Sequence, residues 1–343
     1  MFLMTLRDMQ YRARRVALVT VLVALVLTLL YLMTGLVNQL QNEPHDAVGG
    51  IGATRWVVAD GVSGPFTSVS VLPAALGASI DAAARPIVVS RGSLTAPGTE
   101  PTEIVVIGHE PGELGRPTIV DGDPITGPDE VVVDESLGLG SGDEVTIGPE
   151  TFTVVGETSR STVLAGQALV FVDLGSAQQL AFQSADVVSG FVVRDGDVGE
   201  IDGATVLTDG EVADDALGPI ESAVSSIDLI RVLLWCVAAI VIGAVIYLTA
   251  LERERDFAVL KAVGASGRSL GAGLALQAVV VALFAAALGA VAGKLIEPLF
   301  PLPVSIPPSA FVTIPSVAVV VGLAAAIVGV RKVNRTDPAE AFG

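Results

Sequence analysis

Cysteine and histidine are nearly absent from this chain. Of its 343 residues one is a cysteine, Cys236, and two are histidines, His45 and His109. A single cysteine excludes a disulfide within the chain, and its place in an apolar run indicates packing rather than redox chemistry. The histidines stand far apart in polar stretches with no cysteine beside them, so we expect no metal site.

Catalytic and nucleotide-binding motifs are also missing. No nucleophile–base pair or metal set is recognisable, which argues against a membrane-anchored enzyme. Residues 289–294 superficially resemble a phosphate loop, but the glycines are one residue too close and no Ser or Thr follows Lys294. Gly289 and Gly293 instead fit the small-xxx-small pattern of closely packed membrane helices. We expect no cofactor bound directly to this chain.

Two acidic clusters, at residues 121–123 and 195–202, raise the possibility of calcium binding. Ile125 and Gly199 occupy positions that an EF-hand loop fills with ligands, so neither cluster has that spacing. Asp-Gly turns explain both clusters, and we favour this structural interpretation.

Charged residues are scarce and unevenly spread. They make up 16% of the chain against 51% hydrophobic residues, and the mean hydropathy of +0.68 excludes an ordinary soluble enzyme. Four uncharged runs each supply the roughly 20 residues that a bilayer-spanning helix needs: 16–37, 232–251, 269–293 and 311–330.

The first of these runs could be a cleaved signal peptide or a membrane anchor. It is longer than the roughly 7–15 apolar residues of a cleaved signal and lacks a following Ala-x-Ala site, so we predict an uncleaved anchor.

Basic residues flank these runs in a pattern that sets the orientation. Three groups stand before the first run, between the second and third, and after the fourth: Arg7, Arg12, Arg14 and Arg15; Arg253, Arg255, Lys261 and Arg268; Arg331, Lys332 and Arg335. Basic flanks of membrane spans face the cytoplasm. We therefore predict a multi-pass protein of the plasma membrane with both termini cytoplasmic.

The fold class follows from this topology. We predict an α-helical membrane protein with four transmembrane helices and an extracytoplasmic α+β domain between the first two. The expected segments are a cytoplasmic N-terminus (1–15), helix 1 and stalk (16–43), the outer domain (44–210), stalk and helix 2 (211–251), a cytoplasmic coupling helix (252–268), helix 3 (269–293), an outer loop (294–310), helix 4 (311–330) and a cytoplasmic tail (331–343).

The segment between the first two spans is strongly acidic. Residues 38–228 hold 6 Arg, no Lys and 30 Asp plus Glu, a net charge of −24. Binding to nucleic acid needs basic patches, so this composition argues against it. The acidity could favour cationic ligands, but a solvated, repulsive surface is the interpretation we prefer.

Within this segment short Val, Ile and Thr runs alternate with Gly, Pro and Asp, which predicts strands. The expected strands are residues 56–59, 87–90, 103–108, 130–134, 144–147, 151–156, 168–173 and 191–194, with a three-residue hairpin turn at 148–150 and a helix at 175–182. We expect Pro44 to end the first helix. An apolar stripe beginning at Val212 predicts a second stalk helix, interrupted at Gly218-Pro219.

A dense charged stretch, residues 251–270, lies between the second and third runs. Phe257, Leu260 and Val263 recur in it at helical spacing, which predicts an amphipathic helix that docks by one face. Such a helix could simply lie on lipid headgroups. The acidic Glu252, Glu254 and Asp256 disfavour this alternative, because anionic lipids would repel them.

Polar and aromatic residues mark the outer membrane boundary. Tyr31, Arg231 and Trp235 are candidates for lining a lateral substrate access between two protomers, although interfacial anchoring explains them better. For Gln277, inside the third run, we expect an interhelical hydrogen bond.

The charged stretch resembles a known family signature. Residues 252–266, ERERDFAVLKAVGAS, are similar to the coupling helix of MacB/FtsX-type ABC transporter permeases, and residues 335–341, RTDPAEA, resemble the family's C-terminal ending. Residues 129–134, 142–143 and 152–156 are similar to its outer-domain core. Residues 256–261 most resemble the DevC-like or heme-exporter-like subgroup.

This resemblance implies partners and a mechanism. It implies a homodimer with two copies of a separate cytoplasmic ABC ATPase, which would hold ATP and Mg²⁺, and transmission of ATPase motion to the outer domains. The implied coupling residues are Glu252, Arg253, Glu254, Arg255, Asp256, Phe257, Leu260, Lys261, Val263 and Gly264.

Two functions remain open. The first is an export permease for a hydrophobic or amphipathic compound such as a lipid, peptide, antibiotic or heme. The alternative is a non-transporting regulator that conveys ATPase motion to an outer partner such as a cell-wall hydrolase. The regulators of this family have smaller outer domains, which favours export. Neither function makes the chain itself an enzyme.

Overall fold

The computed structural model describes residues 13–80, 83–112, 114–194, 196, 198–252, 259, 267–300 and 302–335. The chain divides into two compact units: the outer domain, Leu40–Val224, and the helical unit, Met1–Gln39 with Ser225–Gly343. Two helices, α2 (Ala13–Gly50) and α6 (Glu221–Glu252), contribute residues to both units.

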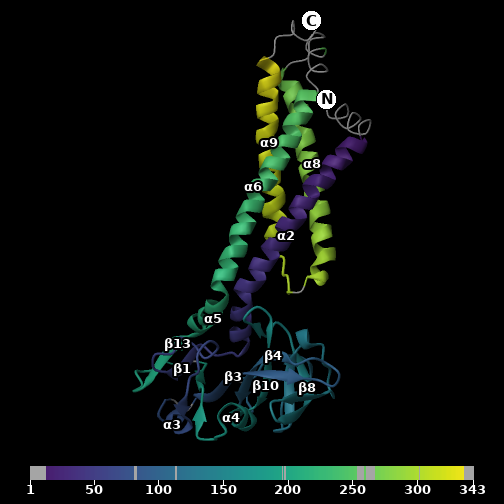
Figure 1. Ribbon diagram of the computed structural model, residues 1–343. Coiled ribbons are helices and arrows are strands. Elements are labelled where there is room, and N and C mark those ends of the chain that lie inside the picture. Colours follow the sequence, from purple (N-terminus) through teal and green to yellow (C-terminus); the bar gives the residue numbers. More distant parts are fainter. Residues whose placement is uncertain are drawn as a thin grey trace. The chain divides into compact units, whose positions relative to one another are not determined.

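Among the described residues, four helices are long and apolar enough to cross a membrane. They are α2, α6, α8 (Gly267–Ile296) and α9 (Ala310–Arg335), drawn as the long coiled ribbons of Figure 1. Each contains one of the predicted runs, so the prediction of four apolar spans is confirmed. A short 3-10 turn, η4 (Glu297–Leu299), follows α8.

Small residues hold the helical unit together. A Cβ added at Gly289 of α8 would lie only 3.1 Å from the Ala24 carbonyl oxygen of α2, and one at Gly293 would lie 3.5 Å from the Tyr31 Cβ. On α9, a Cβ added at Gly329 would approach the Ala250 Cβ of α6 within 2.7 Å. Larger side chains would separate these helices, so the packing role predicted for residues 289–293 is confirmed.

The outer domain is built on one mixed sheet of 11 strands with the main order β13-β1-β12-β3-β4-β10-β6-β8-β5. β7 pairs with β3 and β8, and β9 pairs with β10, whereas β2 and β11 form a separate pair. The strands are β1 (Arg55–Ala59), β2 (Leu72–Pro73), β3 (Arg85–Thr95), β4 (Thr102–His109), β5 (Ile119–Gly122), β6 (Glu130–Asp134), β7 (Glu144–Ile147), β8 (Glu150–Thr158), β9 (Thr162–Val163), β10 (Gln167–Asp173), β11 (Val187–Val188), β12 (Gly190–Val193) and β13 (Ala204–Thr208). β4 and β6 run parallel to β10 and β8 respectively, and the other pairs are antiparallel.

Short helices complete this domain. They are η1 (Ala74–Leu76), α3 (Gly77–Ile80), η2 (Glu135–Leu137), α4 (Leu174–Phe182), α5 (Asp209–Leu217) and η3 (Gly218–Ile220).

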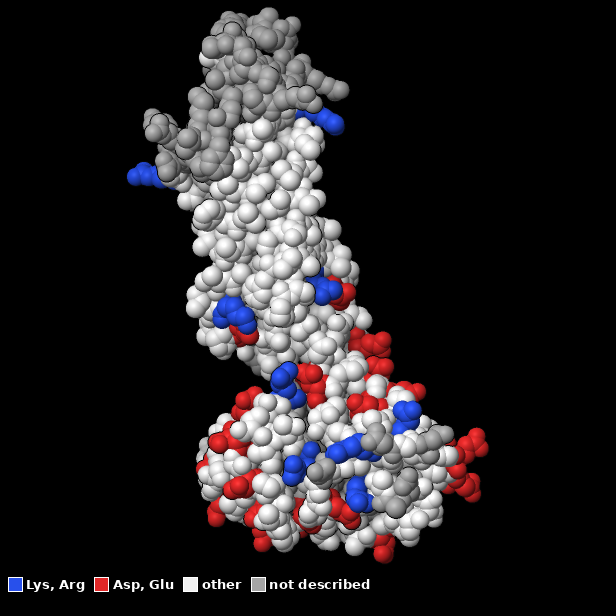
Figure 2. All heavy atoms as spheres, turned by 180° about the vertical axis from the view of Figure 1, so that it is seen from behind, with Lys and Arg blue, Asp and Glu red and all other residues white. Residues whose placement is uncertain are grey.

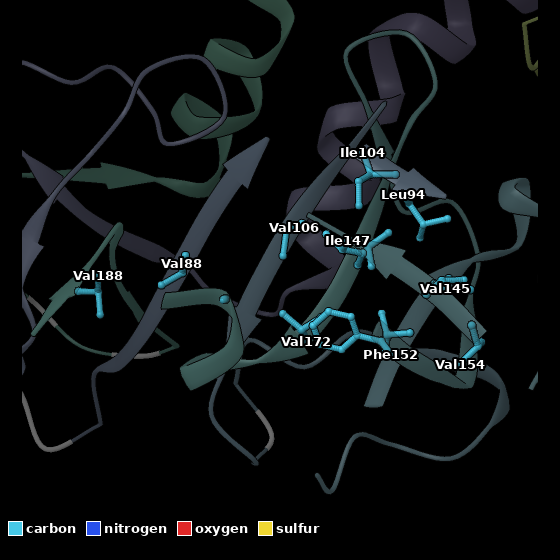
Figure 3. Close-up of a cluster of buried hydrophobic side chains, with 14 of the residues drawn as sticks. Val88, Leu94, Ile104, Val106, Val145, Ile147, Phe152, Val154, Val172 and Val188 are labelled. Atoms are coloured by element: carbon cyan, nitrogen blue, oxygen red, sulfur yellow. The ribbon is translucent and has the colours of Figure 1, made fainter. Parts of the chain in front are cut away.

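Alternate strand residues point to opposite faces of the sheet and form two buried clusters. Val106, Val170 and Ala177 belong to the cluster on the face that α4 covers. Figure 3 shows this cluster, with Phe152 among the side chains of β7, β8 and β10. Neighbouring residues such as Val105 and Phe171 belong to the second cluster, together with residues of α2 and α5.

All eight expected strands are present, but two other expectations, the end of the first helix and the length of one hairpin turn, are wrong. Pro44 does not end the first helix: α2 continues to Gly50. Proline costs one backbone hydrogen bond, but the turns after it bury Ala47 and Val48 in the second cluster, which favours continuation. The β7–β8 turn has two residues rather than three, because Ile147 pairs directly with Glu150. Gly148 takes φ +60°, which suits the first position of a type II′ turn.

Candidate functional site: helix α6 and its anchorage

The predicted coupling residues begin where α6 ends. Glu252, the last residue of α6, is exposed. The next described residue is Val259, helical and 53% exposed, and α8 begins at Gly267. The remaining predicted coupling residues lie outside the described residues: Arg253, Glu254, Arg255, Asp256, Phe257, Leu260, Lys261, Val263 and Gly264.

Helix α6 packs within the helical unit by one narrow stripe. Ala238, Ile242, Ile246 and Ala250 recur every four residues and are buried. Gly322 and Gly329 of α9 lie against Ile242 and Ala250 of this stripe. The rest of the helix exposes large apolar side chains: Leu229, Ile230, Val232, Leu233, Val237, Ile240 and Leu248. Such a surface suits lipid or another apolar helix rather than water.

The residues proposed for substrate access fall into two places. Arg231 forms an ion pair with Asp228 on α6, and Trp235 is half-buried one turn further along. Tyr31 is buried on α2, where its ring stacks on Phe311 of α9 with 5.5 Å between the ring centroids. Arg231 and Trp235 thus lie one helical turn apart on α6, and no described contact joins Tyr31 to either.

Charge is sparse on the helical unit. Figure 2 shows its described surface as largely white, with a few neighbouring blue and red side chains. Lys294 and Glu297 form an ion pair of 2.8 Å at the end of α8.

The side-chain oxygen of Gln277, buried on α8, has no hydrogen-bond partner among the described residues, so the expected interhelical bond is not found for that atom. The described residues contain no group of three potential His, Cys, Asp or Glu metal ligands.

Helix α5, which leads through η3 into α6, is fixed firmly in the outer domain. Thr208 caps its first turn in a reciprocal capping box with Glu211. The indole Nε1 of Trp56 donates to Asp209 Oδ1 over 3.3 Å. Hydroxyl groups of Ser63 and Thr67 donate to the Asp215 carboxylate. Its apolar face, Val212, Ala213 and Ala216, is fully buried in the second cluster.

The end of α2 is anchored in the same cluster. Glu43 is 3% exposed and its carboxylate accepts a hydrogen bond of 2.7 Å from the Gly166 backbone N–H. Ala47 and Val48, one turn further, pack in the second cluster beside the α5 residues. Sequence reasoning missed Glu43 and Trp56 as anchoring residues. The one available signal is the helical spacing of Glu43 with Leu40 and Ala47, which places a carboxylate on a buried face.

Comparisons with known proteins identify relatives of the whole chain. Residues 229–338 match the family model "FtsX-like permease C-terminal". An "Uncharacterized ABC transporter permease", Rv2563 of Mycobacterium tuberculosis, is 39% identical over 349 residues, covering 100% of this chain and 99% of that protein. A second from the same species, Rv0072, is 36% identical over 354 residues, again covering 100% and 99%.

Solved structures resemble part of the chain. The periplasmic region of MacB from Actinobacillus actinomycetemcomitans aligns with a TM-score of 0.36 and 14% identity, covering 50% of this chain and 96% of that one. The extracellular domain of the noncanonic ABC-type transporter YknZ from Gram-positive bacteria aligns with a TM-score of 0.31 and 13% identity, covering 44% and 85%.

Proposed function

The chain belongs to the MacB/FtsX-type ABC transporter permeases, and we propose that it is the membrane subunit of an exporter driven by a separate cytoplasmic ATPase. ATP and Mg²⁺ would bind that partner, and this chain would transmit its motion across the membrane. The exported compound would be hydrophobic or amphipathic.

The observation that carries this proposal is the common anchorage of α2 and α5. Both bury residues in the second cluster of the outer domain. From α5 the chain passes through η3 into α6, which runs without interruption to Glu252, at the beginning of the charged segment (residues 251–270). Packed protein interiors resist compression and transmit displacement. Force applied at the charged segment would therefore reach the outer domain through helix ends that are buried in its core.

The charged segment would supply the docking surface for the ATPase. In this proposal Phe257, Leu260 and Val263 insert into a groove of the ATPase, whereas Arg253, Arg255 and Lys261 pair with charges at its rim. Glu252, Glu254, Asp256 and Gly264 complete the segment. Basic residues flank membrane spans on the cytoplasmic side. We therefore assign the charged segment and both ends of the chain, which all carry such residues, to the cytoplasm.

A second copy of this chain would complete the assembly. The exposed apolar side chains of α6 offer a surface on which a symmetric partner helix could pack. At the outer end of α6, the ion pair of Arg231 with Asp228 and the adjacent Trp235 would anchor the helix at the interface with water. Substrate access at this level, near Tyr31, Arg231 and Trp235, would then lie along the dimer interface.

Docking is tested by co-purification of the chain with its ATPase from cells that express both. The double variant Phe257→Asp plus Leu260→Asp should lose the ATPase, because two carboxylates cannot enter an apolar groove without a large desolvation cost. Ala258→Asp plus Ala262→Asp introduces the same number of carboxylates on the opposite side of a helix that carries Phe257, Leu260 and Val263, and should retain the ATPase. Undiminished co-purification of the double variant refutes the docking role.

Export is separated from regulation by the ATPase activity of the reconstituted pair in vesicles. Stimulation by heme, lipid or a peptide antibiotic, coupled to its movement across the membrane, supports export. Stimulation by none of these, together with binding of the outer domain to a cell-wall hydrolase, supports the regulator instead.

A further inference from the structure

Strand β13 forms one edge of the large sheet, because it pairs with β1 on one side only. Figure 1 shows it at the margin of the outer domain beside β1. The Asp60 N–H donates to the carbonyl oxygen of Gly203, the residue before β13. In an antiparallel pair, residues that bond to the partner strand alternate with residues that face away from it. Ala204 and Val206 therefore direct their backbone groups toward the open edge.

This edge lacks the irregularity that protects many edge strands. β1 and β13 stay in register over all 5 residues of β13. β5, at the opposite end of the sheet, has a register shift between Ile119 and Asp121. Bulges of that kind twist an edge away from other strands. The regular edge of β13 is thus suited to pairing with a further strand.

The chain that precedes β13 begins to cover this edge and then leaves it. Ile201 forms an isolated bridge with Ala204, and the pairing goes no further. The turn between them explains the interruption: Gly203 takes φ +76°, whereas Asp202 does not take a positive φ, which is the pattern of a type II turn. Such turns splay the flanking strands. Among the residues that the structure describes, none bonds to the Val206 backbone from this side.

A cavity of about 640 Å³ occupies the space between the two segments. Val198, Gly199 and Glu200 line it on one side, and Ala204 and Val206 line it on the other. The side chains of Val198 and Val206 also pack against the buried cluster on the α4 face, so the core supports both walls. The volume lies within the range of roughly 300–1,000 Å³ that is typical of ligand sites. It is therefore large enough for a short extended stretch of polypeptide.

The charged residues among the described lining are all acidic: Asp60, Glu200 and Asp202. Each is exposed, and none forms an ion pair with a described residue. The Asp60 carboxylate accepts hydrogen bonds from neutral donors, the Gly61 N–H and the Thr205 hydroxyl, which leave its charge in place. The described residues contain no group of three potential metal ligands, so this rim favours a basic polypeptide over a metal ion.

We propose that the edge of β13 binds an extended, basic segment of a partner protein. A residue opposite Val206 would exchange both backbone hydrogen bonds with it, and a neighbouring residue of the segment would donate to the Ala204 carbonyl oxygen. Lysine or arginine side chains of the segment would face the acidic rim of the cavity. A second copy of this chain is a poorer occupant, because two β13 edges would bring the same carboxylates together. The inference does not depend on the proposed ATPase mechanism.

Fluorescence anisotropy of a labelled peptide tests the charge of the occupant, with the full chain in zwitterionic nanodiscs. A peptide of alternating lysine and valine, KVKVKV, should bind, and its acidic counterpart EVEVEV should not. Asp60→Asn plus Glu200→Gln keeps the Asp60 hydrogen bonds and should weaken KVKVKV binding by at least about fivefold, because two attracting charges are lost. Glu100→Gln plus Glu144→Gln removes two exposed charges outside the cavity and should bind as the wild type does.

A second pair of variants tests the backbone. Val206→Pro removes the N–H on the open edge and leaves the bonds between β13 and β1 in place, because proline is tolerated where a strand faces away from its neighbour. It should weaken KVKVKV binding by at least about fivefold, through the lost hydrogen bond. Val206→Thr keeps the N–H and the branched side chain and should bind as the wild type does. Melting temperatures show whether both variants fold.

Several outcomes overturn the proposal. They are absence of KVKVKV binding, equal binding of EVEVEV, and an equal loss in the Glu100→Gln plus Glu144→Gln variant. Unchanged affinity of Val206→Pro also overturns it. If Val206→Pro melts below Val206→Thr, the Asp60→Asn plus Glu200→Gln variant decides, and its unchanged affinity overturns the proposal. Disulfide-linked dimers of Val206→Cys in a Cys236→Ser background, without peptide binding to the wild type, would identify a second copy as the occupant instead.

Discussion

Trp56 Nε1 donates a hydrogen bond to Asp209 Oδ1 over 3.3 Å, and this contact joins β1 to the first residue of α5. The indole ring is fully buried and packs against Phe66, with 6.1 Å between the ring centroids. Because α5 leads into α6, the Trp56–Asp209 pair fixes the outer-domain end of the path along which we propose that motion travels. Its loss should therefore affect both stability and coupling.

Replacement of Trp56 by Phe should destabilise the outer domain by about 2 kcal/mol, because it removes buried apolar surface and leaves the Asp209 carboxylate without its donor. For a domain of this size that corresponds to a melting temperature lower by about 4–8 °C. The measurement is thermal unfolding of the purified chain in detergent, followed by far-UV circular dichroism.

The chain contains two tryptophans, so Trp235→Phe provides the same chemical change at a half-buried position on α6. This control should melt close to the wild type. If Trp56→Phe melts no lower than Trp235→Phe, the hydrogen bond and the indole packing do not stabilise the domain.

Much of the outer domain can be predicted from the sequence because its central strands are short Val- and Ile-rich runs between Gly, Pro and Asp. β6 and β7 begin and end at the predicted residues. β5 escapes such prediction because its residues are mostly exposed, and β13 because its residues are only partly buried. Pro44 misleads for a different reason: burial of the turns beyond it outweighs the local cost of proline.

The candidate site likewise has one part that the sequence predicts and one that it does not. The charged segment is evident from sequence because dense charge beside an apolar run is a local pattern. The contact between Trp56 and Asp209 is not, since 153 residues separate the two and only the pairing of β1 with β13 brings them together.

The tight approach of α8 to α2 gives a second prediction. A Cβ at Gly289 would lie 3.1 Å from the Ala24 carbonyl oxygen and 3.2 Å from the Leu27 Cβ. Gly289→Val should therefore force the helices apart and destabilise the helical unit by about 1–3 kcal/mol. Gly243→Val on α6 is the matched control, because a Cβ there meets no described atom within 4 Å. Equal melting of the two variants in detergent would contradict close packing at Gly289.

The buried imidazole of His109 predicts a pH dependence of stability. Burial lowers the pKa of His109 below its ordinary value of 6.5, although the Glu110 carbonyl oxygen accepts a hydrogen bond from Nδ1 over 2.9 Å. Between the lowered pKa and 6.5 the unfolded chain binds more protons than the folded chain, so the free energy of unfolding rises with pH in that window. Stability should fall as the pH drops below about 6.5.

Melting temperatures measured between about pH 5.5 and pH 7.5 test this dependence, because this range extends to both sides of the ordinary histidine pKa. His109→Gln should have a smaller change in melting temperature across this range than the wild type. His45→Gln should retain the change that His109 causes. If His109→Gln retains the full change, protonation of His109 does not limit stability.

The last prediction concerns the path from α5 to α6. The 3-10 turn η3 keeps these helices connected at Gly218, and mechanical transmission requires that connection to stay short and stiff. Insertion of two glycines between Leu217 and Gly218 should leave ATPase docking intact and abolish ATP-dependent movement of the outer domain, because a flexible joint absorbs displacement. The same insertion between Gly98 and Thr99, in an exposed turn, should preserve the movement. Movement is measured by spin-label distances between two copies in nanodiscs, with Ser136→Cys as the labelling site and Cys236→Ser as background. An undiminished ATP-dependent distance change after the insertion at Leu217 would show that motion reaches the outer domain by another route, such as α2 alone.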